Sequence, residues 1–93
     1  MDTRTAADAA DIERGAAFVR AQCASCHAVG RDGRSPNSLA PPLREIGRRY
    51  PVEQLAEAFA EGIVTAHPGM PQFVLTPDQN RSLIAYLEII QSP

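Results

Sequence analysis

Apolar residues recur at helical spacing in three parts of the chain, and the last of these carries the most complete set of helix signals. Thr76 and Gln79 stand three residues apart, as in a capping box, with Pro77 at the first helical position. Beyond them, apolar side chains follow at intervals of three and four residues over 83–90. The pattern predicts a C-terminal helix that begins at Pro77 and buries one face.

An N-terminal helix is expected from about Thr5 to Gln22, where apolar residues again recur at helical spacing. Asp8 and Asp11 lie near its start, where acidic side chains favour the positive end of the helix dipole. Gly15 interrupts this alanine-rich helix at a cost of about 1 kcal/mol relative to alanine. Either the glycine is simply tolerated there, or another helix crosses closely at this position.

Glycine and proline are frequent between the predicted helices. Their density over residues 24–50 excludes a long helix or a sheet and predicts a wrapping loop, with room for a short helical turn at 43–49. Pro51 then begins the second main helix, for which Gly62 supplies the stop. Residues 64–75 form another loop, and no strand signal is present. The pattern therefore predicts an all-α fold with three main helices and long loops.

The chain is short for a domain that must bury a core of its own. Its 93 residues allow a single domain over 1–93, of which we expect 1–7 to be a flexible N-terminal extension. Only 20 residues are leucine, isoleucine, valine or phenylalanine, while 15 are alanine and tryptophan is absent. Domains of this size and composition usually depend on a disulfide, a metal, a cofactor or a partner for stability. We therefore expect something other than side chains to complete the core.

Charge and hydropathy exclude two classes of function. The net charge is −2, with nine arginines and no lysine, so the basic excess of a nucleic-acid binder is missing. No apolar run approaches the roughly 18 residues that a membrane span needs. Residues 20–49 nevertheless carry six arginines against two acidic residues. This basic segment is either ordinary solvated surface or a positive patch that orients an acidic partner.

Both cysteines and one of the two histidines lie in five consecutive positions, Cys23-Ala24-Ser25-Cys26-His27. This Cys-x-x-Cys-His order is the signature of covalent c-type haem attachment. Thiols three residues apart can reach the two vinyl groups on adjacent rings, and His27 is then carried beneath the iron. Its neutral imidazole suits an axial ligand when the other ring nitrogen donates to an acceptor that fixes the tautomer. The motif predicts haem c, which would also complete the core.

Three other interpretations of these residues have less support. A disulfide between Cys23 and Cys26 would close a very small loop and stabilise little. A thioredoxin-like redox pair opens a helix after a strand, whereas this pair closes a helix in a chain without strand signals. Zinc needs four ligands, which would be these two cysteines, His27 and His67, and the adjacent Cys26 and His27 can hardly serve one tetrahedral ion together.

The sixth iron position decides whether a haem binds small molecules or only passes electrons. Apart from the initiator, Met70 is the sole methionine, and it lies in a proline- and glycine-rich loop 43 residues after His27. A lone methionine is usually core filler, but beside a haem signature we interpret Met70 as the second iron ligand. His67 is the alternative, and its ligation would lower the reduction potential.

These motifs together give the chain a resemblance to the class I cytochromes c, from about residue 11 to 91. Gly15 stands eight residues before Cys23, as in that family. The resemblance implies the class I cytochrome c fold, wrapped around one covalently bound haem. It also implies that the first and last helices cross, with Gly15 allowing Leu83 and Tyr86 to approach.

The resemblance assigns further residues to the haem. The sequence Ala-Pro-Pro-Leu at 40–43 resembles the family loop whose proline carbonyl accepts a hydrogen bond from the proximal histidine. By this resemblance Pro41 orients His27, and Leu43 packs against the haem.

The sequence Met-Pro-Gln-Phe at 70–73 resembles the family's ligand loop, which again assigns Met70 to the iron. The resemblance also implies that Arg49, or alternatively Arg48, pairs with a haem propionate. The lysines that surround the haem edge in mitochondrial-type members are absent, so docking to the same acidic partners is not implied.

By this resemblance the protein is expected to be a soluble periplasmic electron carrier, not an enzyme, whose iron cycles between Fe(II) and Fe(III). We expect a monomer that takes electrons from a periplasmic dehydrogenase and gives them to an oxidase or reductase. The alternatives are a gas sensor or peroxidase-like protein with a dissociable Met70, or an electron-input domain of a larger oxidoreductase. Residues 1–10 lack the apolar core of a signal peptide, so we expect a processed protein or an excised domain.

Overall fold

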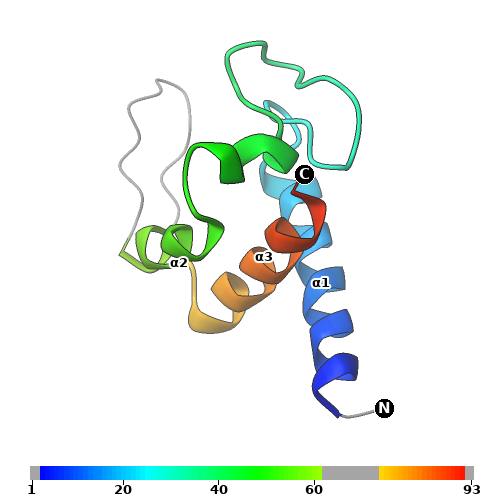
Figure 1. Ribbon diagram of the computed structural model, residues 1–93, viewed down its shortest axis with the longest axis vertical. Helices are drawn as coiled ribbons and strands as arrows, with labels where there is room; N and C mark the ends of the chain where they lie inside the picture. The colour runs from blue at the N-terminus through cyan, green and yellow to red at the C-terminus, as the bar shows by residue number, and fades with distance from the viewer. Residues whose placement is uncertain (1–2, 62–73, 92–93) are drawn as a thin grey trace.

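A computed structural model of the chain describes residues 3–61 and 74–91, and every regular element in these ranges is helical (Figure 1). In chain order the elements are α1 (Thr3–Gln22), the 3-10 helix η1 (Leu43–Arg48), α2 (Val52–Glu61) and α3 (Pro77–Ile90). The expected all-α architecture and its three main helices are confirmed. Because α1 begins at Thr3, its first turn falls within residues 1–7, where the sequence predicted a flexible extension.

Helix α3 is the central element of the fold, because it contacts α1, α2 and η1 (Figure 1). It crosses α1 closely at Gly15. A Cβ atom added to Gly15 would overlap the carbonyl oxygen of Ser82 and lie 2.7 Å from Cβ of Tyr86. Val19 and Leu83, one from each helix, are fully buried. The close helix crossing is therefore confirmed, and simple tolerance of the glycine is wrong.

The start of α3 carries the predicted capping box. The hydroxyl of Thr76 accepts a hydrogen bond from the Gln79 backbone N–H at 3.2 Å. In return the Gln79 side-chain oxygen accepts from the Thr76 backbone N–H at 3.0 Å. Two of the N–H groups at the helix start are thus satisfied within four residues, which is why this boundary is readable from sequence.

Asp11 has a different role from the one predicted. No acidic residue lies in the first turn of α1, because the helix begins at Thr3, so the prediction that Asp8 and Asp11 lie at the helix start is wrong. Its buried carboxylate instead joins the two crossing helices. One oxygen accepts from Arg14 at 3.0 Å and from the Ser82 hydroxyl at 3.2 Å, and the other accepts from Arg81 at 3.1 Å.

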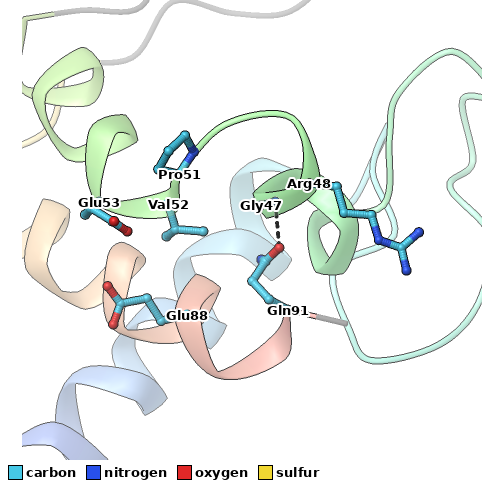
Figure 2. A pocket seen from close by; sticks show the side chains of 7 residues that line it. All are labelled: Gly47, Arg48, Pro51, Val52, Glu53, Glu88 and Gln91. Carbon is cyan, nitrogen blue, oxygen red and sulfur yellow. Dashed lines mark hydrogen bonds between the residues drawn. The ribbon is translucent and has the colours of Figure 1, made fainter. Parts of the chain in front are cut away.

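Gln91, at the end of α3, fixes η1 against that helix. Its side-chain oxygen accepts a hydrogen bond from the Gly47 backbone N–H at 2.7 Å (Figure 2). Its side-chain nitrogen donates to the carbonyl oxygens of Leu43 at 2.9 Å and Leu87 at 2.8 Å. A single amide therefore connects both ends of η1 to α3, and thereby positions the loop that precedes η1.

Candidate functional site

Residues 23–27 continue from α1 as one tight turn. The backbone N–H of Cys26 donates to the carbonyl oxygen of Cys23 at 3.2 Å, and that of His27 donates to the same oxygen at 2.9 Å. Residues three and four positions apart in a helical turn lie on one side of it. The turn therefore gathers both thiols and the imidazole on the same side of the backbone.

Both thiols are free and half-buried, so no disulfide joins Cys23 to Cys26. Burial raises the pKa of the Cys23 thiol to about 11, because the thiolate would lose its hydration. The Ser25 hydroxyl lies 3.8 Å from the Cys26 sulfur, within the range of a weak hydrogen bond to sulfur. Within residues 3–61 and 74–91, no group of three or more histidine, cysteine or acidic side chains could hold a metal ion.

The imidazole of His27 is held by a residue from the following loop. Its Nδ1 lies 2.7 Å from the carbonyl oxygen of Pro41. A carbonyl oxygen can only accept, so Nδ1 carries the proton in this contact. In a neutral imidazole this leaves the lone pair of Nε2 available for a metal.

The loop that supplies Pro41 is connected to the cysteine turn at several points. The Leu43 backbone N–H donates to the Ala28 carbonyl at 2.9 Å, and the Asn37 N–H donates to the Cys26 carbonyl at 3.1 Å. Ser35 accepts from the Ala28 N–H through its hydroxyl at 3.0 Å. Sequence reasoning missed Ser35 and Asn37, whose only local signal is the preference of short polar residues for turns.

Several apolar side chains that are only partly buried pack against the buried hydrophobic core. They belong to both crossing helices, to η1, to α2, to the cysteine turn and to the loop that follows this turn: Phe18, Cys23, Val29, Ile46, Leu55, Phe59, Ile84 and Tyr86. Leu43, the predicted haem-packing residue, is itself buried within the core cluster. Together with two free thiols and an oriented imidazole, this set of residues fits haem, a large apolar group whose iron accepts a histidine ligand.

The structure gives no contact between the cysteine turn and the remaining predicted site residues that it describes, Arg48 and Arg49. Arg49 and Arg48 are both exposed at the end of η1, and Arg48 forms an ion pair with Glu45 at 3.4 Å. Met70 and His67 lie outside the described residues. The predicted ligand loop therefore stays a prediction.

A pocket of about 340 Å³ lies between η1, α2 and α3, and Arg48 is the one predicted site residue among those that line it (Figure 2). The carboxylates of Glu53 and Glu88 line it, while the guanidinium group of Arg48 points away from both of them. It offers no sulfur or imidazole, and it is separate from the cysteine turn. None of the helices that the structure describes is long and apolar enough to cross a membrane.

The helical fold and the Cys-x-x-Cys-His turn define a small c-type cytochrome. Residues 10–87 match the family model of cytochrome c oxidase, cbb3-type, subunit III, and the chain belongs to this family. It is also 30% identical over 80 residues to a cytochrome c-553-like protein from Synechocystis. The matched region covers 86% of this chain and 70% of that protein. No solved structure matches the chain.

Family membership confirms three of the expectations. The fold is that of a small class I cytochrome c, the cofactor is haem c with its iron, and the protein is an electron carrier rather than an enzyme. The alternative readings of the cysteine pair as a thioredoxin-like centre or a zinc site are therefore wrong.

Proposed function

We propose that the protein is a monohaem electron carrier of the periplasm, with one haem attached through Cys23 and Cys26 and with iron held by His27 and Met70. The observation that carries this proposal is the single turn that gathers two free thiols and an imidazole whose Nδ1 is already engaged by Pro41. Haem, when bound, takes up and releases one electron at its iron. Side chains of the protein attach the haem and bind its iron.

Cys23 and Cys26 provide the covalent attachment in this proposal. Each thiol adds across one vinyl group, so that a carbon–sulfur bond forms and the thiol proton passes to the other vinyl carbon, with no external oxidant. Two bonds to residues three positions apart in one turn would also fix the position of His27.

In this proposal His27 and Met70 would hold the iron. The carbonyl of Pro41, 2.7 Å from Nδ1, holds the imidazole ring in the orientation that presents Nε2. The thioether of Met70 would raise the reduction potential of the iron relative to a second imidazole. With both positions filled, electron transfer requires no substrate binding at the iron.

The electron partners are expected to be proteins of the periplasm. We propose a dehydrogenase as donor and an oxidase or reductase as acceptor, with the carrier acting as a monomer. The basic segment over residues 20–49 supports docking to an acidic surface, since it holds six arginines and two acidic residues. If charge steers this docking, turnover with the partner slows as ionic strength rises.

A second candidate is supported by the family description. The matched family is named for a subunit of an oxidase, so this domain could deliver electrons within a larger enzyme. The operon and the full-length sequence of the gene distinguish the two cases. If the same open reading frame encodes a further domain, this domain would be the electron-input domain of a larger enzyme and not a free carrier.

Optical spectra of the oxidised and reduced holoprotein test the proposed ligation. Sulfur ligation to ferric iron gives a weak near-infrared band, which should be present in the parent protein and absent from Met70→Ala. His67→Ala is the matched control and should retain the band. Absence of the band from the parent protein would make Met70 ligation wrong and His67 the first suspect.

A further inference from the structure

Helices α2 and α3 enclose a second pocket beside the one already described. This pocket has a volume of about 590 Å³, and small or apolar residues of both helices line most of it, among them Ala56, Ala60, Ile84 and Ala85. Glu88 lines this pocket and also the first one, of about 340 Å³. The two pockets therefore meet at Glu88 and form one surface depression, which we call the α2–α3 groove.

Hydrogen bonds fix the spacing of the two helices at this groove. The side-chain nitrogen of Asn80 on α3 donates to the carbonyl oxygen of Ala56 on α2 at 2.6 Å. The backbone N–H of Leu75 donates to the carbonyl oxygen of Phe59 at 3.0 Å. Alanine side chains are too short to fill the space between the helices. The groove is thus a formed feature of the folded chain and does not depend on an occupant.

Unpaired carboxylates border the groove. Glu53 and Glu88 line it and are exposed, and neither forms an ion pair or a hydrogen bond with a described residue. Figure 2 shows both of them on the same side of the first pocket, with the guanidinium group of Arg48 pointing away. Glu57 and Glu61, also exposed, continue a row along α2 from Glu53, because residues four apart lie on one side of a helix.

This half of the chain has no cation that could offset the row. Like charges four residues apart destabilise a helix, and α2 ends in Glu61 with no basic residue in its last turn, where a cation would be favourable. Residues 50–93 hold five acidic residues and one arginine, Arg81, which is already paired with Asp11 and Asp78. Basic groups from outside the chain would therefore stabilise this surface.

We propose that the α2–α3 groove is a docking site for a basic amphipathic helix of a partner protein. Apolar side chains of that helix enter the groove, and its lysine or arginine side chains pair with the row that begins at Glu53. A basic residue at every fourth position matches the row, since both then repeat at about 6 Å. Carboxylates repel anionic phospholipids, so the charge favours a protein over a membrane surface.

The docking site is separate from the haem-binding turn. Neither pocket is lined by a residue of the cysteine turn or of the loop over residues 28–42. The partner can therefore remain bound while the haem edge beside Cys23 and Cys26 exchanges electrons with another protein. The inference goes beyond the proposed electron transfer and does not depend on which residues bind the iron.

Binding of a designed peptide to the holoprotein tests the proposal. The probe is a fluorescein-labelled amphipathic helix of leucine and lysine with lysine at every fourth position, and the same peptide with glutamate in place of lysine is its control. Fluorescence anisotropy should show saturable binding of the lysine peptide alone. In nitrogen-15-labelled reduced holoprotein, the peptide should shift the backbone amide resonances of Ala56, Ala60 and Ala85 more than those of residues 20–42.

Two double variants with the same change in net charge test the role of the carboxylates. Glu53→Gln combined with Glu88→Gln should weaken peptide binding about three- to tenfold, because two exposed ion pairs are lost. Glu13→Gln combined with Asp32→Asn removes two exposed acidic residues outside the groove and should weaken binding less than about twofold. Equal losses in the two double variants would overturn the proposal.

A second matched pair tests the groove itself. Ala60→Arg should abolish peptide binding, because its side chain occupies the groove and pairs with the carboxylates there. Ala17→Arg introduces the same charge at an exposed alanine of α1 and should retain binding. Resonance shifts confined to residues 20–42 would overturn the proposal.

Two other occupants would also contradict the proposal. Self-association of the holoprotein that is lost in Ala60→Arg would make a second copy of the chain the occupant. Binding of phosphatidylglycerol vesicles with shifts at the groove resonances would make it a membrane. Haem absorption and the near-infrared band should be the same in all variants, so failure of the docking would leave the proposed electron transfer standing.

Discussion

His27 and Pro41 are 14 residues apart in the chain, and the ring nitrogen Nδ1 of the histidine lies 2.7 Å from the carbonyl oxygen of the proline. The contact joins the end of the cysteine turn to the loop before η1. It fixes the tautomer in which Nδ1 carries the proton, and leaves the lone pair of Nε2 available for a metal. The orientation of the imidazole is therefore a property of the folded chain, since it depends on how residues 24–42 return to the turn.

Replacing Pro41 by glycine should loosen this contact while retaining a carbonyl at the position. Added backbone freedom in the unfolded chain should lower stability by about 1 kcal/mol. In the holoprotein, the Nδ1 proton of His27 should exchange with solvent faster, as measured by nuclear magnetic resonance. Pro36→Gly, in an exposed part of the same loop, controls for the general effect of glycine. Equal exchange rates in the two variants would show that Pro41 has no special orienting role.

Gly15→Ala should be strongly destabilising. The new methyl group would overlap the Ser82 carbonyl oxygen and lie 2.7 Å from Cβ of Tyr86, and neither backbone nor Cβ can move without separating the helices. Overpacking of this kind costs about 1–3 kcal/mol. Gly30→Ala is the matched control, because no atom lies within 4 Å of the position its methyl group would take. Denaturant unfolding of both holoproteins measures the difference, and equal losses would contradict the tight crossing.

Asp11→Asn should weaken the contact between α1 and α3. The substitution removes the charge that accepts from Arg14, Arg81 and Ser82, in a position where the side chain of Asp11 is 10% exposed. Hydrogen bonds from charged groups contribute about 1.5–3 kcal/mol each, so a loss of at least about 1 kcal/mol is expected. Asp78→Asn removes an exposed partner of Arg81 and should cost less than about 0.5 kcal/mol.

The two cysteines should contribute separately to covalent attachment. Cys23→Ala or Cys26→Ala should each retain haem through one thioether, with the absorption maximum of the pyridine haemochrome shifted to longer wavelength. The double variant should release its haem into acidified acetone. A parent protein that also releases haem under these conditions would rule out thioether attachment.

Removal of the cofactor should unfold most of the chain. The side chains that are completely buried among the described residues are few, with Val19 and Leu83 the largest, and many other apolar residues are only partly buried. The double cysteine variant, produced without haem, should show little helical circular dichroism and no cooperative melting. A compact apoprotein with a cooperative transition would mean that the side chains suffice for the fold.

Much of the fold could be predicted from residues that are close together in the sequence. The boundary at Thr76 is readable because the residues that satisfy one another's backbone groups lie within four positions. Cys23, Cys26 and His27 are equally local, since one turn of backbone brings them together. Gly15 indicated a close crossing, and the family resemblance supplied its partners.

The contacts of Asp11 and Gln91 and the burial of Arg44 could not be predicted from the sequence in the same way. Asp11 meets Arg81 across 70 residues, and Gln91 meets Leu43 across 48, so their partners depend on how the helices pack. Arg44 differs from Arg48 and Arg49 through its enclosure, a property that no neighbour in the sequence indicates.

The sequence by itself determined the three main helices, the N-terminal cap of α3 and the Cys-x-x-Cys-His turn, because backbone hydrogen bonds and side-chain spacing act over a few residues. The family resemblance already named Pro41 as the residue that orients His27, and only the tertiary structure decided which carboxylate joins α1 to α3 and which arginine is withdrawn from water. Burial and long-range hydrogen bonds arise when distant segments pack together, and they have no local pattern in the chain.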